Sequence, residues 1–188
     1  MRKLKLQVQI SIDGFVSTGP DDEQHWVTWQ WQEIRPHVIA LSDSTDTILI
    51  GRKLAVDYIP YWQSVYTQPG DPMHEIAVRV MNAKKVVLTK TLERSEWENT
   101  VLAKGDLAEE VNKLKRQEGK DIIVYGGASF VSALIREGLI DEYHLFVNPV
   151  AIGRGGAIFG GLDTFRKLSL KETTVFPCGI VKLHYQPL

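Results

Sequence analysis

The segment "IIVYGGASF", residues 122–130, passes from a strand directly into a helix, with two glycines at the junction. Residues 122–124 are consecutive, apolar and β-branched, which is typical of a strand that is buried on both faces. Apolar residues at 130, 131, 134 and 135 then recur along one face of a helix. The pair Gly126-Gly127 has two explanations. Either glycine is a steric convenience at this turn, or the bare backbone lets an anionic ligand approach the free N–H groups of the helix.

Length and composition restrict the class of protein. The chain has 188 residues, enough for one domain with a substantial core, and its 44% hydrophobic residues exclude global disorder. No apolar run approaches the roughly 20 residues that span a bilayer, and the alternating pattern of residues 1–14 predicts a strand rather than a secretory signal. Cys178 is the single cysteine, which excludes an intrachain disulfide and a cysteine-rich zinc site. We therefore expect a cytoplasmic protein without a membrane partner. The net charge of −1 gives no electrostatic indication of nucleic-acid binding.

Strands and helices alternate over the first 140 residues. The patterns predict strands at 3–12, 47–51, 84–90 and 122–124, and helices near 33–43, from Arg52 (a short one), from Asp71-Pro72, from Asp106 to Gly119 and after Gly127. Asp71 and Asp106 are the expected N-caps of their helices. After residue 140, segments 141–152 and 168–187 alternate without intervening helices, which predicts antiparallel strands. Residues 1–188 are therefore expected to form a single α/β domain, with a mostly parallel sheet, flanking helices and an antiparallel C-terminal edge.

Three strand ends have a related character: "ILIGRKL" (48–54), "VVLTKT" (86–91) and "IVYGGASF" (123–130). Cations follow two of them, Arg52-Lys53 and Lys90. A cation at the start of a helix opposes the helix dipole, which suggests an anionic partner; the alternative is a solvated pair, and for Lys53 alone this is favoured. Because ligands of open α/β sheets collect at the carboxyl ends of strands, a phosphate-bearing ligand is predicted there. The dinucleotide fingerprint G-x-G-x-x-G and the Walker lysine pattern are both absent.

Four segments, at 9–18, 47–54, 84–90 and 122–159, resemble the dihydrofolate-reductase-like superfamily. The similarity is closest to the C-terminal reductase domain of the riboflavin-biosynthesis deaminase–reductase and its stand-alone relatives. It covers nearly the whole chain and implies a dihydrofolate-reductase-like fold, a homodimer and NADPH as cofactor. It also implies the cofactor-binding residues, with Arg52 at the 2′-phosphate and residues 126–130 at the pyrophosphate: Gly51, Arg52, Lys53, Thr89, Lys90, Gly126, Gly127, Ala128, Ser129 and Phe130. Gly153, Gly155 and Gly156 match a glycine-rich turn of the family, for which a structural role is expected.

The substrate side is less well defined. The first strand and the resemblance place five residues beside a substrate: Gln9, Ser11, Trp26, Glu33 and Tyr125. If that face of the strand is exposed, Gln9 and Ser11 are surface residues without a role in binding. Glu33 is equally explained as a solvated acid at a helix start. Tyr125 stands where the family has an acidic residue, and segment 40–44 lacks the arginine expected for a phosphoribosyl group.

No residue is identified as the proton donor, and the five histidines show no metal-ligand spacing, so no metal is expected. The resemblance implies an NADPH-dependent reductase of a small planar heterocycle, pyrimidine- or pterin-like. It is similar to 5-amino-6-(5-phosphoribosylamino)uracil reductase or dihydrofolate reductase. The alternative is a non-catalytic NADPH-binding protein, a sensor or a partner subunit, because the cofactor residues match the family better than the substrate residues do.

Overall fold

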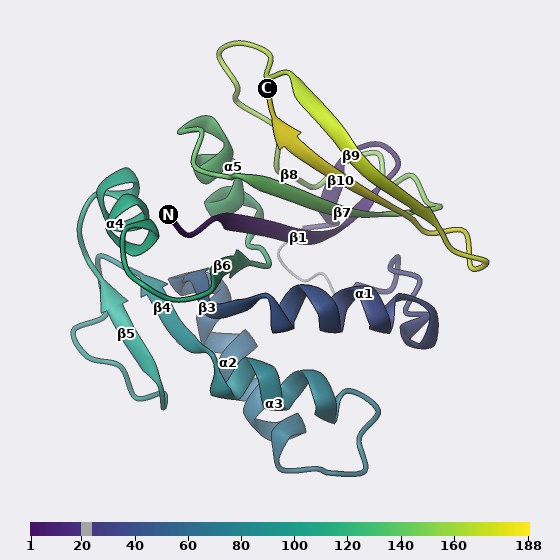
Figure 1. The fold of residues 1–188 in the computed structure, drawn as a ribbon. Helices are drawn as coiled ribbons and strands as arrows, with labels where there is room; N and C mark the ends of the chain where they lie inside the picture. Colours follow the sequence, from purple (N-terminus) through teal and green to yellow (C-terminus); the bar gives the residue numbers. More distant parts are fainter. Residues whose placement is uncertain (20–23) are drawn as a thin grey trace.

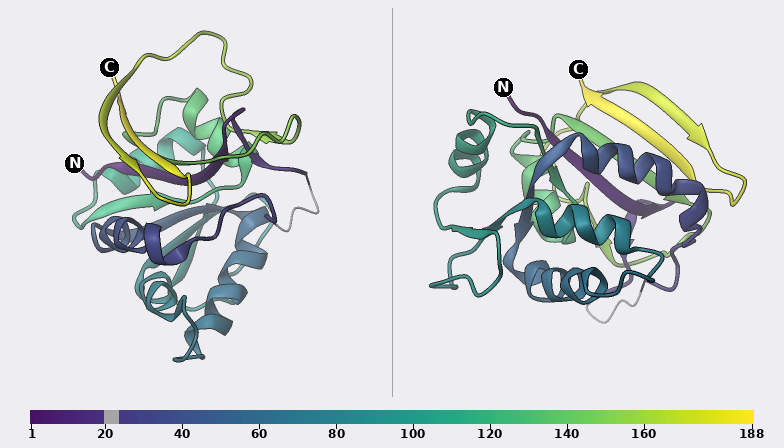
Figure 2. Two further views of the ribbon diagram at one scale, coloured as in Figure 1. Left: turned by 90° about the vertical axis from the view of Figure 1, so that its right-hand side faces the viewer. Right: turned by 60° about the horizontal axis from the view of Figure 1, so that its bottom comes forward.

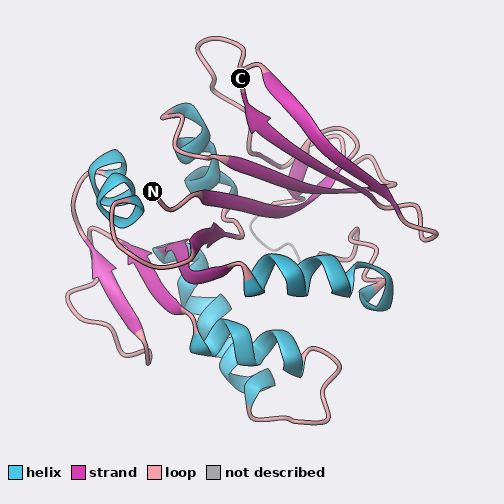
Figure 3. Ribbon diagram, in the orientation of Figure 1, coloured by secondary structure: helices cyan, strands magenta, loops and turns pink. Residues whose placement is uncertain are grey.

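A computed structural model describes residues 1–19 and 24–188 and contains an eight-stranded twisted sheet with helices on both faces (Figures 1 and 2). The strand order is β5-β4-β3-β6-β1-β7-β10-β9. These strands are β1 (Leu4–Ser11), β3 (Thr45–Gly51), β4 (Lys84–Leu88), β5 (Thr100–Ala103), β6 (Asp121–Val124), β7 (Glu142–Asn148), β9 (Leu168–Val175) and β10 (Val181–Pro187). A separate two-stranded pair joins β2 (Phe15–Ser17) to β8 (Gly156–Ala157). Figure 3 separates these strands from the helices by colour.

Pairing is parallel from β5 through to β7, and β1 lies between β6 and β7. Antiparallel pairing begins between β7 and β10 and continues to β9 at the edge. The predicted α/β fold with an antiparallel C-terminal edge is therefore confirmed. One detail differs, since segment 141–152 supplies a strand that is parallel to β1 as well as antiparallel to β10.

The helices divide into two layers. α1 (Trp31–Asp43), α2 (Arg52–Tyr66) and α3 (His74–Asn82) pack on one face, and α4 (Leu107–Lys115) and α5 (Ala128–Arg136) pack on the other. The alternation of β1 directs Leu4, Leu6, Val8 and Ile10 toward α4 and α5. Burying each of these side chains contributes about 1.5–3 kcal/mol. Ile12, predicted on the same face, lies beyond the end of β1 and is exposed.

Three local expectations differ from the structure. The helix from Arg52 is not short: it continues to Tyr66 with Pro60 inside it. α3 begins at His74, so the prediction that Asp71 is its N-cap is wrong; Asp71 Oδ1 instead accepts a hydrogen bond from Met73 N in the preceding turn. β5 was not predicted. The N-cap prediction for Asp106 is confirmed, because its carboxylate accepts hydrogen bonds from two backbone N–H groups of the first turn of α4.

Within the described ranges, 1–19 and 24–188, no helix combines the length and apolar character that crossing a membrane requires.

Candidate functional site

One cavity, of about 340 Å³, lies where three strand ends meet. β3 and β4 are adjacent parallel strands that finish side by side, with Gly51 opposite Leu88. β6 pairs with β3 on the other side and leads directly into α5. The carboxyl ends of these strands therefore open at one edge of the sheet, where ligands of such sheets bind.

Most residues expected to bind a cofactor line this cavity. Gly51, Arg52 and Lys53 come from the end of β3, Thr89 and Lys90 from the end of β4, and Gly127, Ser129 and Phe130 from the start of α5. Gly126 and Ala128 adjoin these residues in the chain but do not line the cavity. Leu54 lines the cavity as well, and sequence reasoning missed Leu88, Thr91 and Ala133. Ala133 could have been found, because it follows Ser129 by one helical turn.

The backbone conformation at the junction of β6 and α5 requires glycine. Gly127 is the N-cap of α5, with φ of 40° and ψ of 119°, and Gly126 has φ of 159°. A Cβ on Gly127 would have no atom nearer than 4.0 Å, so conformation rather than crowding is the constraint. No side chain of residues 1–19 or 24–188 caps α5, so the N–H groups of its first turn find no side-chain acceptor there. Both explanations of the glycine pair are thus compatible, since the turn needs glycine and also presents free donors.

The glycine-rich turn after β7 has a structural role. A Cβ on Gly155 would clash with Ser17 O, and a Cβ on Gly156 would lie 2.8 Å from Ala128 Cβ. Gly155 therefore lets the backbone of β2 pass close to this turn, and Gly156 lets the β2–β8 pair approach the start of α5.

The charged side chains described in the lining of the cavity are all cationic. Arg52, Lys53 and Lys90 line it, and none of the lining residues within 1–19 and 24–188 is acidic. None of these three cations forms an ion pair or hydrogen bond with another residue of the described ranges. Converging cations without acidic partners raise the local potential and favour an anionic ligand.

Thr89 shapes the loop that carries Lys90. Its side chain is buried, and its Oγ1 accepts hydrogen bonds from Thr91 N and Leu92 N, both at 3.1 Å. The hydroxyl can still donate its own hydrogen to a ligand.

The residues expected beside a substrate do not line the same cavity. Gln9 is half-buried near the carboxyl end of β1, and its Oε1 accepts a hydrogen bond from Asn148 Nδ2 at 2.9 Å. Ser11 is 2% exposed; its hydroxyl donates to Asp13 Oδ1 at 2.6 Å and accepts from Phe15 N at 2.9 Å. Ser11 is therefore engaged in the turn after β1. Trp26 is half-buried in the segment before α1.

Glu33 and Tyr125 are both held by neighbouring elements. Glu33, in the first turn of α1, accepts a hydrogen bond through Oε2 from Cys178 N at 3.0 Å, which connects α1 to the turn between β9 and β10. Tyr125 stacks on Tyr58 of α2, with ring centroids 5.8 Å apart. Burial raises the pKa of Tyr125 to about 12, so it is a neutral hydroxyl near pH 7.

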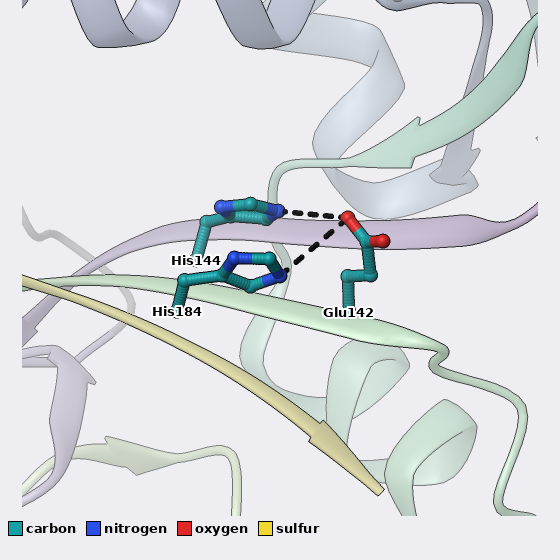
Figure 4. Close-up of side chains that lie close together, drawn as sticks. All are labelled: Glu142, His144 and His184. Atoms are coloured by element: carbon teal, nitrogen blue, oxygen red, sulfur yellow. Dashed lines mark hydrogen bonds and ion pairs between the residues drawn. The ribbon is translucent and has the colours of Figure 1, made fainter. Parts of the chain in front are cut away.

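A second cluster, Glu142, His144 and His184, lies on β7 and β10 (Figure 4). Their ligand-type atoms lie within 4.8 Å of one another, and His144 Nε2 is 3.2 Å from Glu142 Oε2. The hydrogen bond with His144, then the hydrogen bond from Lys3 and the nearby charges of Lys5 and Lys3, hold the pKa of Glu142 well below its usual range. This cluster was not predictable from the local sequence pattern, because it depends on the pairing of His144 with His184 across two strands.

The geometry of the two rings argues against a shared metal ion. The imidazoles are stacked, with centroids 4.2 Å apart and planes 17° apart. The lone pair of a ring nitrogen lies in the ring plane, so an ion bound by both Nε2 atoms would have to lie in both planes. Stacked, nearly parallel rings do not meet this condition. The arrangement is a buried carboxylate that accepts from a histidine and a lysine.

The family model described as RibD C-terminal domain matches residues 2–182. The Bacillus subtilis protein YyaP, described as uncharacterized, is 34% identical over 190 residues, which cover 98% of this chain and 94% of YyaP.

Two solved structures share the fold. A diaminohydroxyphosphoribosylaminopyrimidine deaminase/5-amino-6-(5-phosphoribosylamino)uracil reductase of Thermotoga maritima has a TM-score of 0.70 at 17% identity; the match covers 100% of this chain and 57% of that one. A pyrimidine reductase-like protein of Corynebacterium diphtheriae has a TM-score of 0.61 at 15% identity, covering 100% of this chain and 92% of that one.

Proposed function

The chain belongs to the RibD C-terminal domain family, and on this basis we propose that it is an NADPH-dependent reductase of a small planar heterocycle, pyrimidine- or pterin-like. The observation that carries the proposal is the cavity at the ends of β3 and β4. It combines three cations with the start of α5, and within the described residues these cations have no ion-pair partner and the helix has no side-chain cap. A dinucleotide with an additional phosphate matches this donor set better than a neutral ligand does.

Each group in the cavity has a distinct task in holding NADPH. Arg52, with Lys53 beside it, would bind the 2′-phosphate, for which a guanidinium offers a paired set of N–H donors. The N–H groups at the start of α5 would bind the pyrophosphate, and Thr89 and Lys90 would flank the adenosine half. When bound, the nicotinamide supplies the hydride. The chain's own contribution is to bind, to orient the rings and to keep water from the reacting atoms.

The substrate is proposed to be a heterocycle without a phosphoribosyl group. In the region of α1 where the family carries an arginine for that group, residues 40–44 supply none. Tyr125, a neutral hydroxyl stacked on Tyr58, replaces an acidic residue. A planar ring between aromatic and polar side chains is consistent with both features.

A second function is favoured by Glu33. Its carboxylate is already hydrogen-bonded to Cys178 N, so it is less available to hold a heterocycle. This observation favours a non-catalytic NADPH-binding protein, in which the cofactor site is kept and the substrate site is not.

Two measurements on the purified chain separate these functions. Fluorescence titration gives the affinity for NADPH, and the decay of NADPH absorbance gives turnover with a panel of pyrimidines, pterins and diketones. Tight NADPH binding with turnover of a panel member supports the reductase. Tight binding without turnover supports the binding protein, and absence of NADPH binding contradicts both.

A further inference from the structure

Asn148 ends β7 and is completely buried. It lies opposite Ser11 in the parallel pairing of β1 with β7. Its side-chain amide is fully engaged: Oδ1 accepts from Thr28 N at 2.8 Å, and Nδ2 donates to Phe146 O at 3.1 Å and to Gln9 Oε1 at 2.9 Å.

These contacts determine the orientation of two amides. The N–H of Thr28 can only donate and the carbonyl of Phe146 can only accept, so the amide of Asn148 has one orientation. Its Nδ2 therefore faces Gln9, and the atom of Gln9 that meets it has to be the oxygen. As a result, the Nε2 group of Gln9 and its two hydrogens point away from Asn148.

The donor group of Gln9 has no partner within the described part of the chain. Among residues 1–19 and 24–188, no group accepts a hydrogen bond from Gln9 Nε2. Gln9 is half-buried near the carboxyl end of β1, between β6 and β7, on the side of the sheet opposite to the apolar face that packs on α4 and α5. A half-buried donor pair without an acceptor, at the ligand-binding edge of such a sheet, is suited to a ligand.

We propose that Asn148 is a positioning residue that holds Gln9 as a hydrogen-bond donor to the substrate. This selects heterocycles that present a ring carbonyl oxygen over those that present an amino group. The inference rests on the proposed function, which supplies a planar heterocyclic substrate. The inference adds that this substrate binds at the carboxyl end of β1. A ring amino group facing Gln9 Nε2 would set donor against donor, and the expected discrimination is about tenfold to a hundredfold in affinity.

The test uses uracil and cytosine. At the same ring carbon, uracil carries a carbonyl oxygen and cytosine carries an amino group. Dissociation constants are measured by NMR titration with and without saturating NADP⁺. The wild-type chain is expected to bind uracil at least about tenfold more tightly. Gln9→Glu keeps the bond from Asn148 but presents an acceptor, so the preference for uracil is expected to disappear or reverse.

Asn148→Asp tests the positioning role. A carboxylate still accepts from Thr28 N but cannot donate to Gln9, which is then free to turn its oxygen toward the ligand. The uracil-to-cytosine preference should fall as it does in Gln9→Glu. A purely structural role would weaken both ligands together and leave their ratio unchanged.

The outcomes separate this inference from the proposed function. Failure to bind NADP⁺ contradicts the proposed function, while the titrations without cofactor still decide the role of Gln9. Equal affinities for uracil and cytosine in the wild type, binding of neither, or an unchanged ratio in Gln9→Glu would each overturn the inference.

Discussion

Phe130, in the first turn of α5, packs directly against Gly51 at the end of β3. A Cβ added to Gly51 would lie 3.1 Å from Phe130 Cγ and 3.2 Å from Phe130 Cβ. The backbone at Gly51 is extended, with φ of −78° and ψ of 147°, so any residue could adopt it. Glycine is needed there because β3 and α5 approach closely, and both residues line the cavity.

Gly51→Ala should therefore push Phe130 out of place. The expected cost is about 1–3 kcal/mol in the free energy of unfolding, together with weaker NADPH binding. Urea unfolding and fluorescence titration measure the two effects. Gly70→Ala is the matched control, because a Cβ there would meet nothing within 4 Å. Equal effects of the two substitutions would show that the contact with Phe130 is unimportant.

Arg52→Ala should separate NADPH from NADH. Loss of a charge-assisted contact with the 2′-phosphate costs about 1.5–3 kcal/mol, so NADPH affinity should fall by roughly 10 to 150 times. NADH lacks that phosphate, and its affinity should change by only about twofold. Arg52→Lys should recover part of the loss. Equal losses for both cofactors would assign Arg52 to the pyrophosphate or the fold, and no loss for either would leave it a solvated cation.

Lys85→Met should lower the free energy of unfolding, because it removes the hydrogen-bond donor of three backbone carbonyls. Lys85 is fully buried on β4, and its Nζ donates to the carbonyls of Val80, Met81 and Ala83 at the end of α3, at 2.9–3.1 Å. Methionine fills similar space but leaves these carbonyls without the donor, at a cost of at least about 1–3 kcal/mol. The urea midpoint of Lys84→Met, at the more exposed neighbouring position, provides the comparison. Similar midpoints for the two variants would refute this role.

Glu142→Gln should remove part of the acid sensitivity of the fold. The pKa of Glu142 is held below its ordinary 4.5, first by the hydrogen bond with His144. The hydrogen bond from Lys3 and the charges of Lys5 and Lys3 lower it further. A depressed carboxyl pKa means that the folded state binds fewer protons, so this stabilisation is complete above about pH 4.5 and is lost as the pH falls.

Unfolding free energies at pH 7 and at progressively lower pH provide the measurement. The wild type should lose stability below about pH 4.5 more steeply than Glu142→Gln does. Glu118→Gln, at an exposed position after α4, should keep the wild-type slope. The same slope in all three proteins would contradict the assignment.

A homodimer is expected through β9. This strand is the outer edge of the sheet, eight residues long, with Leu170 52% and Val175 72% exposed. Exposed edges of this kind are commonly covered by association. Light scattering should give twice the chain mass of 21.2 kDa, and Val175→Lys should shift it toward one chain. Val101→Lys, on the opposite edge strand β5, should leave the dimer intact. A wild-type mass of one chain would rule the dimer out.

Arg52, Thr89 and Gly127 could be brought together from sequence because each follows an apolar run that ends in a short polar motif. Parallel strands place their carboxyl ends at one edge, so recognising the strands was sufficient to predict a shared cavity. β5 escaped this reasoning because Thr100–Ala103 is only four residues long and largely unburied. The length of α2 was underestimated because Pro60 weakens a helical pattern that tertiary packing nevertheless maintains.

Asn148 could not be identified in the same way. Its importance depends on the register between β1 and β7 and on the path of residue 28, none of which is encoded in the local pattern. The stacking of His144 on His184 likewise requires the pairing of β7 with β10. Contacts of this kind join segments that sequence periodicity treats independently.

The position of β1 at the centre of the sheet has a consequence for synthesis. Leu4 pairs with Ile122, and its N–H donates to the carboxylate of Asp141, 137 residues further along the chain. At typical rates of translation, on the order of ten seconds pass between the synthesis of β1 and that of its neighbours β6 and β7. During that interval β3 and β4 can already associate around α2 and α3, whereas Leu4 and Leu6 stay uncovered. β1 precedes every other strand of this sheet in the chain and yet is among the last to be covered, so this nascent segment is where a chaperone would be needed.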